Sequence, residues 1–82
     1  MGLSFRKKRW DKPFPQKIAK RVSRIATGDL TMWADQSIYE IGRLLSIYER
    51  HRTPEAIKEL TEATEALHAV VHELNKRTTS IL

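Results

Sequence analysis

Several residue types that carry common protein chemistry are absent or scarce in this 82-residue chain. It has no cysteine, which excludes disulfide bonds and thiolate metal sites and leaves the redox compartment unread. Its three glycines are too few and too scattered to form a glycine-rich phosphate-binding loop. No serine or threonine stands at a recognisable spacing from a base and an orienting acid. We therefore expect a protein that is not an enzyme and binds no cofactor.

Long apolar runs are also missing. No stretch approaches the roughly 18 residues that a membrane-spanning helix needs, and the first residues lack the apolar centre of a signal peptide. We accordingly expect a cytoplasmic protein. A chain of this length forms one small domain that buries only about 60% of its unfolded surface, so its core gains from association with another molecule.

Acidic residues are scarce at the front of the chain. Residues 1–24 contain nine lysines and arginines and one acid, Asp11, which gives a net charge of +8. The remainder holds six basic and nine acidic residues, a net charge of −3, in agreement with +5 for the whole chain. The sequence therefore predicts a basic front part followed by a mildly acidic one.

The acidic part has the pattern of an antiparallel helical hairpin. Thr53 can accept a hydrogen bond from the first turn of a helix, Pro54 suits the first helical position, and Glu55 is favourable at the positive end of the helix dipole. Apolar residues recur at spacings of three and four on both sides of this point. The pattern predicts helices over about 29–51 and 54–77, and thus an all-α fold.

The hairpin is expected to leave one side of its apolar seam open. Two such hairpins would form a four-helix bundle, so we predict a homo-oligomer, most simply a dimer. Three apolar residues, Met32, Tyr39 and Ile47, lie off the main stripe and indicate a second contact surface, through which the protein could instead dock as a small subunit or adaptor on a larger assembly. The predicted interface residues are Leu30, Met32, Trp33, Ile38, Tyr39, Ile41, Leu45, Ile47, Leu60, Leu67, Val71 and Leu74.

The chain before the hairpin is predicted to hold a short helix and an arm. Residues 15–27 have a helical apolar spacing with basic residues opposite, which is typical of an amphipathic helix. Gly28 can take the left-handed conformation that ends this helix, and Asp29 can cap the next one. Residues 1–14 form an extended basic arm, and 15–82 form a single helical domain.

The basic front is the main functional lead. Lysines and arginines interleaved with Trp10 and Phe14 suit a polyanion, either a nucleic acid or an anionic membrane surface, and also an acidic protein partner. A helix-turn-helix is disfavoured, because the helix that follows the turn is acidic. The predicted polyanion-binding residues are Arg6, Lys7, Lys8, Arg9, Trp10, Lys12, Lys17, Lys20, Arg21 and Arg24.

One group of residues has metal-ligating chemistry. On a helix Glu65, His68 and His72 fall within about 60° of arc and could present a carboxylate and two imidazoles to one metal ion. That arc faces solvent, where ordinary surface histidines give the same pattern, so we predict no bound metal. A metal-binding helical protein remains the third functional alternative, after the polyanion-binding module and the adaptor.

Overall fold

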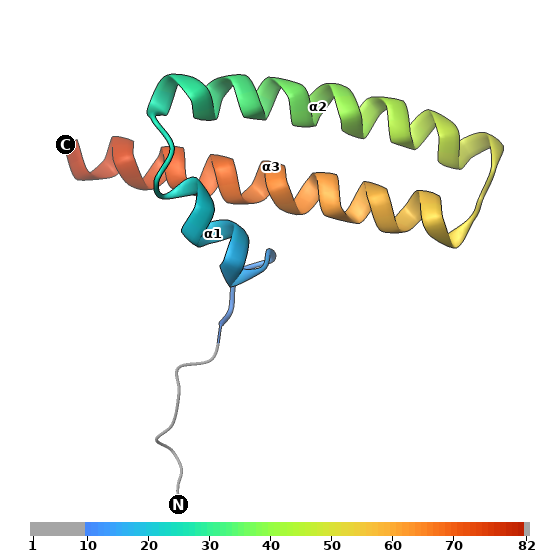
Figure 1. Ribbon diagram of the computed structural model, residues 1–82, viewed down its shortest axis with the longest axis horizontal. Helices are drawn as coiled ribbons and strands as arrows, with labels where there is room; N and C mark the ends of the chain where they lie inside the picture. Colours follow the sequence, from blue (N-terminus) through green and yellow to red (C-terminus); the bar gives the residue numbers. More distant parts are fainter. Residues whose placement is uncertain (1–9, 82) are drawn as a thin grey trace, which may run out of the picture.

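The part of the chain that the structure describes is all-helical. The computed structural model describes residues 10–81, in which α1 spans Gln16–Val22, α2 spans Thr27–Arg50 and α3 spans Pro54–Ile81. Helices α2 and α3 run antiparallel and side by side, and α1 lies across the end of α3 that is far from their connecting turn (Figure 1). The predicted all-α fold, a helical hairpin preceded by a short helix, is confirmed.

Local chemistry sets the start of α3, as predicted. The backbone N–H of Ala56 donates a hydrogen bond to Thr53 Oγ1 at 3.1 Å, and Pro54 is the first helical residue. The predicted end near residue 77 is wrong, because α3 continues to Ile81. The hydroxyls of Thr78 and Thr79 donate to carbonyl oxygens four residues earlier, at 2.9 and 2.8 Å, so these polar side chains are satisfied within the helix.

The junction between α1 and α2 differs from the prediction. Helix α1 ends at Val22 rather than near residue 27, and α2 begins at Thr27, so Gly28 and Asp29 lie in its first turn instead of separating two helices. The N-cap is Ala26, whose side chain makes no capping hydrogen bond. Asp29 still contributes a favourable charge at the positive end of the helix dipole.

Helix α1 stops early in a tight turn that an arginine of α3 contacts. In this turn the Ile25 N–H donates to the Val22 carbonyl oxygen at 3.2 Å, three residues earlier. Arg77 of α3 donates to the carbonyl oxygens of Val22 at 3.3 Å and Ser23 at 3.4 Å, and to Thr27 Oγ1 at 3.0 Å. Continuing α1 would require those carbonyls to accept from backbone N–H groups four residues later. Arg77 also donates through Nε to Glu73 at 2.9 Å, and the Glu73 side chain, which the sequence pattern places on the outer face, is buried at 8% exposure. We call Arg77 with these partners the arginine node.

The core lies at one end of the hairpin. Buried Phe14, Val22 and Leu30 pack with Ala69 and Val70, where α1, α2 and α3 meet. Near the turn the buried hydrophobic residues are Leu44 and Ala56. The partly buried residues that pack against the core cluster are Ile18, Ala19, Ile25, Trp33, Ala34 and Leu74.

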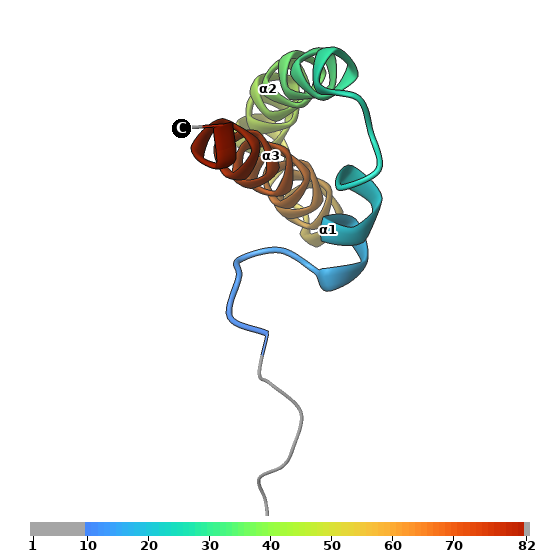
Figure 2. The ribbon, with the colours of Figure 1, turned by 90° about the vertical axis from the view of Figure 1, so that its left-hand side faces the viewer.

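The described chain is thin and extended. Its radius of gyration is 15.7 Å and its shortest dimension is 18 Å, whereas a compact domain of this length has a radius of gyration of about 11–12 Å. Figure 2 shows the cause: α1 covers one side of the hairpin, and no described residue covers the other. One broad side of the two long helices is therefore open.

Candidate functional site

The uncovered side of α3 carries apolar residues. Successive helical residues are about 100° apart, so Val71 points roughly 160° away from Ala69, two residues earlier. Ala69 belongs to the core cluster and is fully buried on the α1 side, whereas Val71 is 50% exposed. Ile57, Leu60 and Leu67 share the Val71 side of the helix.

The uncovered side of α2 matches it. Trp33 packs against the core on the α1 side, and Ile38, five residues later, is turned about 140° from it. Leu45 follows Ile38 by two turns and points in nearly the same direction. Ile38 is 57% exposed, Leu45 47% and Ile57 42%. We name this surface the open face, and its residues are Ile38, Ile41, Leu45, Ile57, Leu60, Leu67 and Val71.

The open face carries almost no charge. Between Ile57 and Thr78 the positions on this side of α3 are occupied by apolar residues, threonine, asparagine and, at the edge, His68. The acids of α2 that border the face are Asp35, three residues before Ile38, and Glu49, beside the turn. Charged residues make up 30% of the whole chain. At 1.5 Å per residue and about 10 Å per helix diameter, the face measures roughly 30 by 20 Å, or about 600 Å². A face of that size is at the upper end of the largest apolar patches on typical monomers, which are often functional.

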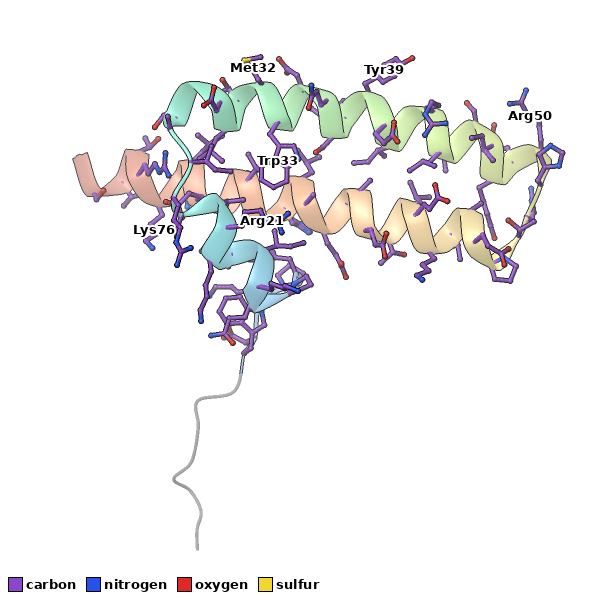
Figure 3. All side chains as sticks on the ribbon, in the orientation of Figure 1. Arg21, Met32, Trp33, Tyr39, Arg50 and Lys76 are labelled. Carbon is purple, nitrogen blue, oxygen red and sulfur yellow. The ribbon has the colours of Figure 1, made fainter. Side chains whose placement is uncertain are left out.

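The predicted interface residues divide among three places. Leu30, Leu74 and much of Trp33 are buried within their own chain, so they are not free to contact another molecule. Met32 and Tyr39, at 62% and 73% exposure, project from α2 away from α3 (Figure 3), and Ile47 lies on the same outer part of α2, half-buried. The structure brings together on the open face Ile38, Ile41, Leu45, Leu60, Leu67 and Val71. It adds Ile57, which the helical spacing from Leu60 could have revealed.

On the opposite side of the hairpin the surface of α1 is basic, although α3 also places Glu62 and Glu65 on that side. The cations of α1 and of the turn after it are exposed, and Lys76 of α3 joins them because it follows Ala69 by two turns and so lies on the α1 side (Figure 3). Among residues 10–81 none of these cations forms an ion pair. We name this surface the basic face, and its residues are Lys17, Lys20, Arg21, Arg24 and Lys76. Lys76 is not among the residues predicted from the sequence, because its place beside the other cations depends on where α1 packs.

The residues before α1 are held against α3. The indole N–H of Trp10 donates to the carbonyl oxygen of Phe14, and the two rings pack edge to face at 6.0 Å. Phe14 is buried and packs edge-on against His72 at 5.5 Å, so it is not free to stack on a base. Lys12 contacts Asp11 at 3.4 Å. The predicted polyanion-binding residues Arg6, Lys7, Lys8 and Arg9 lie outside the described residues.

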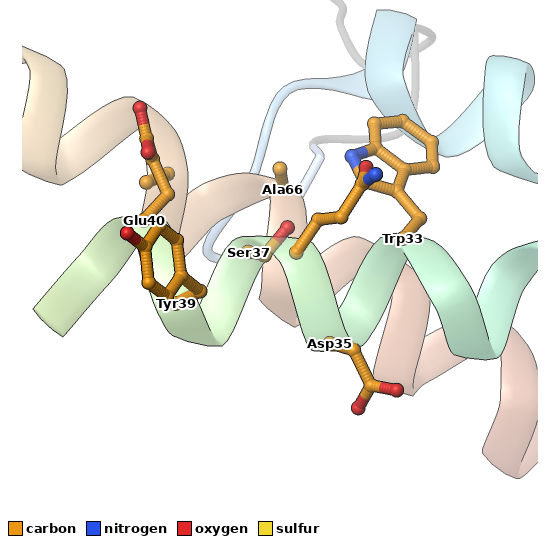
Figure 4. Close-up of a pocket in the computed structure, with 8 residues that line it drawn as sticks. Trp33, Asp35, Ser37, Tyr39, Glu40 and Ala66 are labelled. Atoms are coloured by element: carbon orange, nitrogen blue, oxygen red, sulfur yellow. The ribbon is translucent and has the colours of Figure 1, made fainter. Parts of the chain in front are cut away.

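A cleft of about 630 Å³ lies between α2 and α3 beside Trp33 (Figure 4). Small residues, Ser37 and Ala66 among them, line it together with Tyr39 and Glu40. Arg43 donates two hydrogen bonds to Glu40, at 2.7 and 3.1 Å, and these bonds lower the pKa of the Glu40 carboxyl and raise that of the guanidinium. The Glu40 carboxylate is therefore already paired, and Asp35 is a second carboxylate that lines the cleft.

The candidate metal site does not form. Among the residues that the structure describes, no three histidine, cysteine, aspartate or glutamate side chains are placed to share a metal ion. The His72 ring instead packs against Phe14, which lies just before α1. Glu65, His68 and His72 are therefore not a metal centre in this arrangement.

Within residues 10–81 no helix combines the length and the apolar composition that crossing a lipid bilayer requires. The chain matches no protein-family model, and comparison with curated proteins and with solved structures finds no match. Function is therefore argued from the two opposed surfaces.

Proposed function

We propose that the protein is a non-enzymatic helical module that self-associates through the open face and binds a polyanion through the basic face. One observation carries this proposal: the hairpin has an apolar surface with little charge on one side, and on the other side α1 and Lys76 present cations that form no ion pair among residues 10–81. Each surface is suited to a different kind of partner. The open face can exclude water by packing against another apolar surface, and the basic face attracts anions.

A second copy of the chain is the occupant that best suits the open face. A partner with charged contact residues would leave them unpaired there, because the face has almost no charge to offer. A second open face presents the same apolar, uncharged chemistry. Two faces of about 600 Å² bury about 1,200 Å² in total, at the lower end of the range for specific interfaces, so we expect a dimer whose population depends on concentration.

A nucleic acid suits the basic face better than a membrane does. The apolar side of α1, with Ile18, Ala19 and Val22, is packed against the core and cannot enter a lipid interface. The basic face has exposed positive charges, and these are sufficient for contacts with phosphate groups. Since Phe14 is buried and Trp10 is packed against it, contact with the phosphate backbone is favoured over base stacking. A cytoplasmic location, expected from the sequence, would give access to such a ligand.

Two charge-insertion variants test the assembly. Ile38→Asp/Leu45→Asp places two carboxylates on the open face at half-exposed positions, where they perturb folding little. Tyr39→Asp/Ser46→Asp is the matched control, because each residue follows its counterpart directly and is turned about 100° away. Sedimentation over a concentration series is expected to show dimers for the wild type and the control, and helical monomers for the first variant. A first variant that still dimerises, or a wild type that stays monomeric, contradicts self-association through this face.

A salt series tests the basic face. Binding of a labelled duplex is measured for the wild type, for Lys20→Gln/Arg21→Gln, and for the control Arg50→Gln/Arg52→Gln at the turn. Each phosphate contact contributes about 0.9 to the slope of log K against log salt concentration, so the first variant is expected to flatten the slope by about 1.8. Equal slopes for the two variants would contradict a role for α1. Anionic vesicles serve as the comparison ligand, and binding to vesicles alone would contradict the choice of nucleic acid.

The outer surface of α2 supports a second candidate function, docking on a larger protein assembly. A shallow groove of about 660 Å³ there is lined by Ile38, Tyr39, Gly42, Arg43 and Ile47, among others, and Tyr39 is the most exposed of the large hydrophobic residues that the structure describes. This candidate predicts that the isolated wild type is monomeric and that the Tyr39→Asp/Ser46→Asp variant loses the partner.

A further inference from the structure

The open face and the basic face of one chain look in nearly opposite directions. On α3, Lys76 of the basic face is turned about 140° from Val71 of the open face, five residues earlier. Helix α1, which carries the other cations, packs on the side of α3 that includes Ala69 and His72 (Figure 2). The hairpin itself separates the two surfaces.

Two-fold symmetry extends this arrangement to a dimer. For two open faces to cover each other, the two-fold axis must lie in the plane between them. Whether that axis runs along the helices or across them, each α1 ends on the outside, and the two basic faces point away from each other. With helix layers packed 8–10 Å apart, the axes of the two α1 helices are separated by roughly 25–30 Å.

A short duplex cannot reach both of these faces. Double-stranded DNA has a persistence length of about 150 base pairs, so bending a duplex of 20–30 base pairs costs free energy that grows with the angle. Passing from one basic face to the other requires the duplex to reverse direction around the dimer, which is a large bend. Each basic face therefore binds its own duplex, and dimerisation does not raise the affinity for a single one.

We infer that the dimer bridges two separate nucleic-acid duplexes, one on each basic face. This inference rests on the proposed function and adds the geometry that decides what dimerisation achieves. The doubling of the basic surface, which would raise avidity if both copies met one ligand, here joins two ligands. The duplexes bind to the cations of α1 and to Lys76, and the dimer forms through the open face, which includes Ile38 and Leu45.

A capture experiment with the full chain tests the inference. A duplex of about 20 base pairs, well below the persistence length, is fixed to beads, and a second, fluorescent duplex of the same length is added with the protein. Wild type and the control Tyr39→Asp/Ser46→Asp are expected to retain the fluorescent duplex, and excess protein is expected to release it by filling each duplex separately. Ile38→Asp/Leu45→Asp is expected to bind the fixed duplex with an unchanged salt dependence and to retain none of the second.

The outcomes separate this inference from the function on which it rests. A wild type that is dimeric and binds a duplex, yet holds one duplex per dimer in sedimentation, overturns bridging and leaves the proposed function standing. Capture by the monomeric Ile38→Asp/Leu45→Asp variant also overturns bridging through the dimer. A wild type that binds no duplex, or that clusters anionic vesicles alone, overturns the nucleic-acid half of the proposed function and bridging with it. A monomeric wild type overturns the assembly half in the same way.

Discussion

Replacing Arg77 by methionine is expected to destabilise the whole fold, because the arginine node joins α3 to the junction of α1 and α2. The substitution keeps an apolar stem but removes the guanidinium that contacts Glu73, Thr27, and the carbonyl oxygens of Val22 and Ser23. It leaves the buried Glu73 carboxylate without its partner and the Ser23 carbonyl without its side-chain donor, whereas the Val22 carbonyl keeps the hydrogen bond from the Ile25 N–H.

The size of the effect follows from these contacts. A hydrogen bond to a charged group contributes about 1.5–3 kcal/mol, and removing one partner of a fully buried ion pair costs about 3–5 kcal/mol. Arg77 is only half-buried, so we expect Arg77→Met to lower the free energy of unfolding by about 2–3 kcal/mol. For a domain of this size that corresponds to a fall in Tm of roughly 10–20 °C.

Urea unfolding followed by circular dichroism measures this loss. All variants must be compared at one protein concentration, since self-association adds to apparent stability. Lys76→Met is the matched control: it removes a neighbouring cation that is exposed and makes no ion pair among the described residues, so its effect is expected within about 0.5 kcal/mol. Equal stabilities of Arg77→Met and Lys76→Met would refute the account of the arginine node.

Three smaller predictions concern the helices themselves. Thr53→Ala removes the acceptor for the Ala56 N–H and is expected to cost about 1 kcal/mol in urea unfolding. Gly42→Ala is expected to stabilise by up to about 1 kcal/mol in the same assay, because the position is helical and an added Cβ meets nothing within 4 Å. NMR titration is expected to find the pKa of Glu40 below its usual range and to see it rise towards that range in Arg43→Gln. Because the folded-state pKa is the lower one, the stabilisation by this pair is present above the usual carboxyl pKa and is lost as pH falls through the lowered value. An unchanged pKa in the variant would contradict the pairing.

Local chemistry allowed the hairpin to be predicted from the sequence. The Thr53-Pro54 start of α3 depends on residues within one turn, and the apolar spacing of three and four depends on the helix alone. Both kinds of information are contained in short stretches of sequence. The start of α3 was accordingly placed at the correct residue.

Long-range contacts decided what could not be predicted. The turn that ends α1 is contacted by Arg77, more than fifty residues away, and Glu73 is buried because α1 folds back over its side of α3. The apolar stripe does not show which of its members face inward: Leu30 and Ile38 share one stripe, yet the first is fully buried and the second is exposed. That division depends on where α1 packs, and α1 could equally have covered the other side. The open face can therefore be identified only when the side that α1 covers is known.

The position of the core at one end of the hairpin gives the molecule a gradient of stability along its length. The end at which α1 crosses is held by the core cluster and the arginine node, whereas the turn end relies on Leu44 and Ala56. We therefore expect local unfolding to begin at the turn and to proceed along the hairpin towards the core. Leu45 and Ile57 of the open face belong to this weaker half. A second copy that covers these two residues would stabilise the turn end. Partner binding and the folding of the turn end would then be one cooperative event.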